Sequence, residues 1–151
     1  MARFVTPSTA CRGWKAAVHF KLGKRVVSAT WRIRDGAWLE KWGGAADDHV
    51  VLPAKLYVGT RWRDPSSFER NGNDASDFEV LALDAQVEAG ADGKSWEPCV
   101  AVLETSAGGK GPPLTHYYAA NVGKVAVREA DTWLLKLVEF RPGRYVHEAA
   151  E

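Results

Sequence analysis

Residues 14–22 and 25–34 each place apolar side chains at every second position. A period of two is typical of a β-strand with one buried face. Gly23 and Lys24 lie between the two segments and suit a two-residue hairpin turn with glycine at its first position. The predicted hairpin pairs Leu22 with Arg25. This register puts the apolar residues of both strands on one face and Lys15 opposite Arg32 on the other.

The rest of the chain shows further strand patterns separated by turn residues. Residues 37–44 follow an Asp35-Gly36 turn and form either a short strand or one helical turn closed by glycine. Residues 78–89 fit a strand or a capped helix, and the hairpin turn at residues 91–94 favours the strand. Apolar residues on both faces of residues 132–140 predict a central strand. The other expected strands cover residues 50–63, 96–104 and 116–128, the last interrupted at 121–123.

These elements predict an all-β fold. About eight short antiparallel strands with turn signals between them are typical of a β-sandwich or a β-barrel, with room for one short helix. Segments 64–77 and 105–115 are expected to be long loops. No internal repeat or low-complexity linker divides the chain, so residues 1–151 are expected to form a single domain.

The composition supports a compact domain. With 46% hydrophobic and 26% charged residues, the 151-residue chain is not of the disordered or collagen-like class. No apolar run approaches the roughly 20 residues of a membrane span, and the first residues lack the basic-then-apolar layout of a secretion signal. We therefore expect a cytoplasmic protein that does not bind a membrane. Cys11 and Cys99 are expected to be reduced, although export would allow one bridge between them.

Charge is distributed unevenly along the chain. Residues 1–63 hold twelve Lys or Arg and four Asp or Glu, a net charge of +8, whereas residues 64–151 carry a net charge of −7. Such asymmetry indicates an acidic partner or contact between copies of the chain, unless the two halves neutralise each other within one sheet. If the strand over residues 50–63 neighbours the hairpin, the outward cations form one face that binds a polyanion. These cations are Lys15, Lys21, Arg32, Arg34, Arg61 and Arg63.

Strand parity divides the tryptophans into two groups. Trp31 and Trp62 share a face with apolar neighbours, so they are expected in the core rather than as platforms for nucleic-acid bases. Trp38 and Trp42 do not fit the hairpin core. They are candidates for exposed rings that stack on a sugar, a base or a protein partner, unless they close one end of a barrel.

His116 is the best candidate for a histidine in a pocket. It follows a Pro-Pro loop and precedes two tyrosines, so His116, Tyr117 and Tyr118 join the two tryptophans Trp38 and Trp42 as candidate ligand-binding residues. An acid–base role for His116 would need a carboxylate nearby. Glu104 is one candidate, but the sequence does not place it.

Motifs for metals and cofactors are weak. Asp47-Asp48-His49 holds three potential ligands, but consecutive residues seldom bind one ion, and no second histidine stands at a ligand spacing. The oxygen-rich run at residues 71–74 with Asp77 fails the EF-hand spacing, and residues 108–111 fail that of a phosphate loop. No metal and no cofactor are predicted. Residues 91–96 resemble the Asp-Gly-Lys-x-Trp hairpins of discoidin-type sandwich domains, over six residues that imply no functional role.

Three functions follow as hypotheses. The first is a non-catalytic β-sheet protein whose basic face docks on a polyanion or an acidic protein surface, which includes a second copy of the chain. The second is a sandwich or barrel that binds a sugar or another small ligand. The third is an enzyme with His116 as acid–base, for which the sequence assigns no further catalytic residue.

Overall fold

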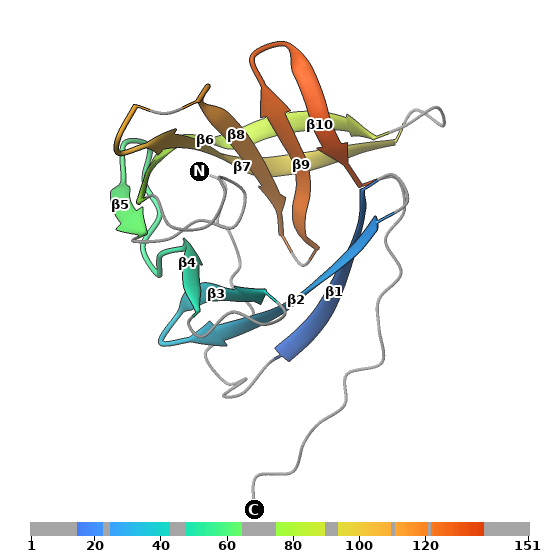
Figure 1. Cartoon of the computed structure of the whole chain (residues 1–151), viewed down its shortest axis with the longest axis horizontal. Helices are drawn as coiled ribbons and strands as arrows, with labels where there is room; N and C mark the ends of the chain where they lie inside the picture. The colour runs from blue at the N-terminus through green and yellow to red at the C-terminus, as the bar shows by residue number, and fades with distance from the viewer. Residues whose placement is uncertain are drawn as a thin grey trace, which may run out of the picture.

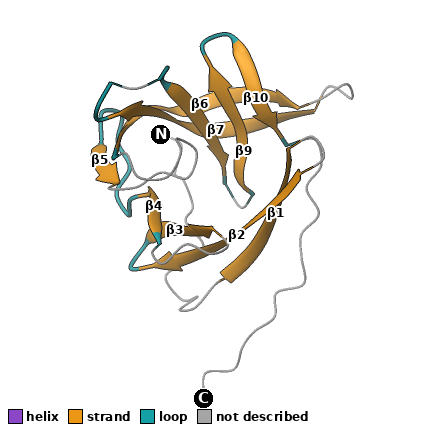
Figure 2. Cartoon of the chain, in the orientation of Figure 1, coloured by secondary structure: helices purple, strands orange, loops and turns teal. Residues whose placement is uncertain are grey.

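The computed structural model describes residues 15–22, 25–42, 48–64, 75–89, 94–109, 111–120 and 122–137. These residues form ten strands and no helix, which confirms the all-β prediction (Figure 2). The strands are β1 (Lys15–Leu22), β2 (Arg25–Arg34), β3 (Ala37–Trp42), β4 (His49–Leu52), β5 (Arg61–Asp64), β6 (Ser76–Ala89), β7 (Lys94–Ser106), β8 (Leu114–Ala119), β9 (Gly123–Glu129) and β10 (Thr132–Lys136).

The strands form two antiparallel sheets. One has the order β1-β2-β3-β4 and the other the order β10-β9-β8-β7-β6-β5, so strands that are consecutive in sequence lie side by side within each sheet. The sheets face each other, with β1–β4 below and β5–β10 above in the view of Figure 1. This arrangement is a β-sandwich. In the described residues there is no helix of the length and apolarity that a membrane crossing requires.

The first hairpin has the predicted register. Leu22 pairs with Arg25, and Lys15 pairs with Arg32. At the next turn both residues have positive φ, 51° at Asp35 and 81° at Gly36, as a type I′ hairpin turn requires. Residues 37–42 are therefore a strand, not a helical turn. The turn at residues 23–24 lies outside the described residues.

Two other sequence predictions are confirmed in the larger sheet. Residues 78–89 belong to the strand β6, whose last residue Ala89 pairs with Lys94 of β7. Residues 116–128 lie on β8 and β9, which are interrupted where the sequence predicted a break. Each of these strands presents one face to the β1–β4 sheet.

The main core lies between the sheets. It joins Trp31, Trp38 and Leu52 of the smaller sheet to four residues of the larger one, namely Val80, Val100, Val102 and Tyr118. Trp31 is 5% exposed and is a core residue as predicted, whereas Trp62 is partly buried and packs against this cluster. Burial of these apolar side chains against each other holds the two sheets together.

A second apolar cluster includes Val87, Cys99 and Ala126. Cys99 is a free thiol here. Burial, together with the charge of Glu97, raises the pKa of Cys99 to about 11. At neutral pH the thiol is therefore protonated, and it is a poor nucleophile.

The prediction of one strand over residues 50–63 is wrong. The chain forms β4, leaves the sheet at Pro53, and begins β5 only at Arg61. Proline cannot donate to a strand ladder, and Gly59 has a φ of 91° that breaks the extended backbone. Val58, which a continuous strand would place on the same face as Trp62, is 65% exposed. As a result β5 pairs with β6 in the larger sheet and does not neighbour the first hairpin.

The predicted central position of residues 132–140 is also wrong. β10 ends at Lys136 and is the edge strand of its sheet. Trp133 and Leu134 are 36% and 49% exposed. The Arg128 guanidinium lies 5.3 Å and the Lys136 ammonium 4.5 Å from the Trp133 ring, so cation–π contacts cover part of that indole instead of a second layer.

Candidate functional site

A histidine and a carboxylate meet on the inner face of the larger sheet. His116 Nε2 lies 3.0 Å from Glu104 Oε1, and the side chains are 1% and 0% exposed. The contact arises from the register of β7 and β8. Val102 pairs with His116, and Glu104 pairs with Leu114, two residues before His116. The two side chains are diagonal neighbours on one face. The structure thus brings to His116 the carboxylate that the sequence could not place.

Aromatic rings continue from this pair in both directions. Trp62 stacks on Phe78 at 5.3 Å between centroids, Phe78 lies 6.5 Å from the His116 ring, and that ring stacks on Tyr118 at 6.3 Å. We call Trp62, Phe78, His116 and Tyr118 the ring row. The buried ammonium of Lys124 lies 5.8 Å from the Tyr118 ring at its far end. The ring row therefore runs from β5 to β8, with the Glu104 carboxyl beside His116 and Lys124 of β9 beyond Tyr118.

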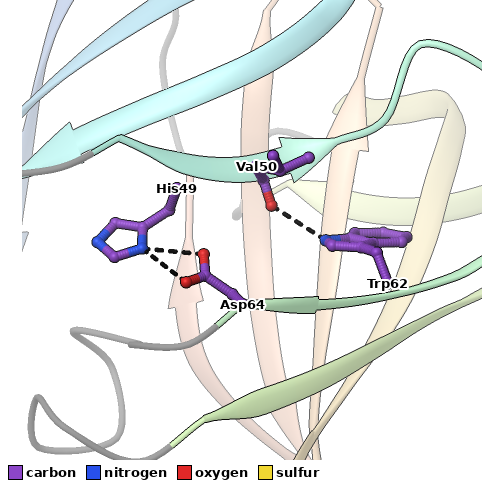
Figure 3. A network of polar contacts seen from close by, with 4 residues as sticks. All are labelled: His49, Val50, Trp62 and Asp64. Atoms are coloured by element: carbon purple, nitrogen blue, oxygen red, sulfur yellow. Dashed lines mark hydrogen bonds and ion pairs between the residues drawn. The ribbon is translucent and has the colours of Figure 1, made fainter.

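Side chains rather than backbone ladders connect β4 to β5. His49 Nδ1 lies 3.0 and 2.9 Å from the two carboxylate oxygens of Asp64, and the Trp62 indole donates to the Val50 carbonyl at 3.0 Å (Figure 3). Asp64 is 6% exposed and the His49 side chain 15%. We call this contact the β4–β5 seam. Because Trp62 takes part in it, the seam also positions the first member of the ring row.

A second row of polar residues runs parallel to the ring row. Glu40 pairs with His49 in register, Asp64 pairs with Ser76, and Ser76 pairs with Ser106. The seam joins the two halves, so Glu40, His49, Asp64, Ser76 and Ser106 form one line over five strands, which we call the polar row. The Trp31 indole donates to Glu40 Oε2 at 2.6 Å and fixes that carboxylate. On β5, β6 and β7 the polar row lies two residues from Trp62, Phe78 and Glu104, so the two rows are adjacent.

The five predicted ligand-binding residues do not form one site. His116 and Tyr118 are neighbours in the ring row. Tyr117 projects from the other face of β8 and contacts Trp133 at 5.5 Å. Trp38 is 5% exposed and lies 6.0 Å from Trp31, so its prediction as an exposed ring is wrong, because β3 turns it into the core. The side chain of Trp42 lies outside the described residues.

The predicted polyanion-binding cations are divided between the two sheets. Arg32 and Arg34 belong to β2, whereas Arg61 and Arg63 belong to β5. The side chains of Lys15 and Lys21 lie outside the described residues. The correction follows from the break at Pro53, which sends β5 to the other sheet.

Each described arginine of that set lies near a carboxylate. Arg32 contacts Asp48, and Arg34 Nε is 3.9 Å from Asp35. Arg61 is 3.2 Å from Glu79, and Arg63 is 2.7 Å from Asp77. The Arg63 hydrogen bond is the main cause that lowers the pKa of Asp77; burial opposes it, and the Arg63 charge adds a smaller lowering. An open groove of about 440 Å³ beside these pairs is lined by Arg61, Asp77 and Glu79 together with Trp62 and Phe78 of the ring row.

The polar row contains residues that sequence reasoning missed. The sequence predicts a long loop over residues 64–77, but Asp64 ends β5 and Ser76 begins β6. A signal for Asp64 was present, because the alternation that places Trp62 inward continues to Asp64 two residues later. Ser76 and Ser106 carry no comparable signal. Only the pairing of β6 with β7 brings them together.

Among the described residues, no group of three His, Cys, Asp or Glu side chains is arranged to hold a metal ion. Asp48 and His49 point to different partners, Arg32 and Asp64. Asp47 and residues 71–74 lie outside the described residues. Comparison of the chain with protein-family models, with curated proteins and with solved structures finds no match.

Proposed function

We propose that this protein binds a small organic ligand on the inner face of its larger sheet, at the end where the ring row and the polar row lie side by side. The observation that carries the proposal is the buried His116–Glu104 pair set between the rings of Phe78 and Tyr118. Apolar ring surface with a few fixed polar groups is the usual composition of a small-molecule site.

Burial of so many ionisable groups argues against a purely structural role. The side chains at most 6% exposed include five ionisable ones, Glu40, Asp64, Glu104, His116 and Lys124. Taking charged groups out of water costs free energy that even a good ion pair only partly recovers, and apolar residues of similar volume would stabilise the sandwich as well or better. Ionisable groups retained in such positions are candidates for a functional site.

A ligand screen with two variants tests the proposal. Tryptophan emission of the wild type is titrated with neutral sugars, indole, adenine and a short-chain fatty acid. His116→Phe keeps a ring in the row, and Glu104→Gln keeps the shape of the side chain while removing its charge. Each is expected to weaken binding of any ligand found by about tenfold, the value of one buried hydrogen bond.

The control for these variants is Glu88→Gln near the other end of β6, where the side chain is exposed. It is expected to bind as the wild type does. Thermal unfolding of all variants identifies any loss that comes from the fold instead of the site. The proposal is refuted if no ligand of the panel changes the tryptophan emission of the wild type.

Fewer observations support the enzyme hypothesis and the polyanion hypothesis. A histidine beside a carboxylate is an arrangement used in acid–base catalysis, so the enzyme hypothesis stays a prediction, tested by turnover of His116→Ala. The polyanion hypothesis also stays a prediction. Its described arginines are each near an acidic side chain, which reduces the charge they present.

A further inference from the structure

We infer that the ligand is a neutral polyhydroxylated ring, a saccharide or a cyclic polyol, and that the polar row binds its hydroxyl groups. This inference rests on the proposed function and names the class of ligand for that site. It assigns a role to Ser76 and Ser106, which the ring row and the His116–Glu104 pair leave unexplained.

The first argument is the state of the two serine hydroxyls. Ser76 is 0% exposed, and the Oγ atoms of Ser76 and Ser106 are both buried without a hydrogen-bond partner. The two residues are directly opposed on β6 and β7, so their side chains lie on the same face. A buried hydroxyl without a partner destabilises a fold, and alanine would fit the same space at lower cost. A ligand that hydrogen-bonds to both serines explains why they are there.

The second argument is what surrounds the serines. Asp64 is opposite Ser76 on one side, and Glu104 is two residues from Ser106 along β7. A carboxylate accepts more than one hydrogen bond, so Asp64 can accept from a ligand hydroxyl while His49 holds it in place. Serine hydroxyls both donate and accept. Such a mixture of donors and acceptors matches the vicinal hydroxyls of a sugar or an inositol.

The adjacent ring row supplies the other half of the recognition. Trp62 and Phe78 lie beside Asp64 and Ser76 and offer aromatic carbon surface. The C–H faces of a saccharide ring pack on such surfaces. An apolar ligand would leave the two serine hydroxyls unsatisfied, and an anionic ligand would meet the carboxylates of Glu40, Asp64 and Glu104. A neutral polyol avoids both penalties.

The experiment uses a panel of neutral mono- and disaccharides and myo-inositol, with cyclohexanol as a ring of similar size and one hydroxyl. Binding to the full chain is measured by calorimetry. We expect at least one polyol to bind the protein. Cyclohexanol should bind the protein at least about tenfold more weakly than that polyol does. Ser76→Ala and Ser106→Ala should each weaken polyol binding by about five- to tenfold.

Stability provides a second readout of the same variants. Because neither hydroxyl has a partner in the protein, Ser76→Ala and Ser106→Ala are expected to melt at the wild-type temperature or above it. The matched control is Ser95→Ala at the other end of β7, whose hydroxyl accepts a hydrogen bond from Gln86. It should leave polyol binding unchanged.

Several outcomes would overturn the inference. It fails if no polyol binds, if cyclohexanol binds as tightly as the polyols, or if polyol affinity is the same in Ser76→Ala and wild type. A lower melting temperature of Ser76→Ala would also refute it, because the hydroxyl would then serve the fold. If indole or a fatty acid binds in the wild type and no polyol does, this inference is wrong while the proposed function stands.

Discussion

Gly123 lies on β9 beneath the Trp31 ring of the opposite sheet. A Cβ atom at this position would come within 1.7 Å of Trp31 Cζ3, and the φ of Gly123 is 102°. Gly123→Ala therefore forces the Trp31 ring out of the core and strains the backbone as well. We expect the free energy of unfolding, measured by urea titration, to fall by about 2–5 kcal/mol, the sum of about 1–3 kcal/mol for overpacking and about 1–2 kcal/mol for the backbone.

Gly59 separates the two causes of that loss. Its φ is 91°, close to that of Gly123, but no atom lies within 4 Å of the position that its Cβ would take. Gly59→Ala is expected to cost only the backbone term, about 1–2 kcal/mol. Equal losses in the two variants would show that contact between Trp31 and β9 does not hold the sheets together.

The residue scale also shows what side-chain parity can and cannot predict. Parity within a strand placed Trp31 and Trp62 inside, and it needed only the neighbouring residues. The direction of the Trp38 side chain is harder to predict, because it depends on the type I′ turn at residues 35–36 and on the pairing of β2 with β3. Local alternation is short-range information, whereas the direction of Trp38 is set by a turn and its partner strand.

At the scale of elements, the first hairpin was predictable and the strand over residues 50–63 was not. The hairpin has two alternating segments and a short turn, and all three specify one register. Between His49 and Asp64 the alternation continues through Pro53 and Gly59, so the pattern conceals the break. The site depends on this break, because it creates the β4–β5 seam and places Asp64 opposite Ser76.

The seam is expected to open more easily than the joins made by strand ladders. Side-chain hydrogen bonds from His49 and Trp62 join β4 to β5 at the seam, whereas β2 and β3 pair through their backbones over six positions. Asp64→Asn removes the carboxylate whose two oxygens both contact His49 Nδ1. We expect hydrogen exchange of the amides in β4 and β5 to accelerate by about tenfold, the loss of one charge-assisted hydrogen bond.

Asp77→Asn is the matched control for the seam. It is also an aspartate to asparagine change, and it removes a carboxylate that binds Arg63 on the outer face. Exchange in β4 should be the same as in the wild type. If Asp64→Asn leaves exchange in β4 and β5 unchanged, His49 and Asp64 do not hold the two sheets together at this edge.

For the whole molecule, strand order decides how the uneven charge of the sequence appears at the surface. The basic first part of the chain contributes β5 to the larger sheet, and the acidic second part contributes β6 beside it. Arg61 therefore meets Glu79, and Arg63 meets Asp77. The lowered pKa of Asp77 keeps its carboxylate ionised, and paired with Arg63, to a lower pH than that at which a free aspartate takes up a proton. Net charge by segment cannot predict such pairing, because it contains no information about which strands are neighbours.

The effect of these ion pairs can be measured by removing the carboxylates that neutralise Arg61 and Arg63. Asp77→Asn combined with Glu79→Gln removes the two carboxylates from Arg61 and Arg63, and binding to a duplex oligonucleotide is followed at rising salt. We expect the double variant to bind more tightly than the wild type, with a salt slope steeper by up to about two, one for each arginine that reaches a phosphate. Asp84→Asn with Glu88→Gln makes the same change of charge elsewhere on β6 and should leave the slope unchanged, since a slope counts local contacts and not net charge. A wild-type slope already as steep as that of the double variant would mean that these arginines reach phosphates despite their carboxylates, and the polyanion hypothesis would then become the better account of the outer face.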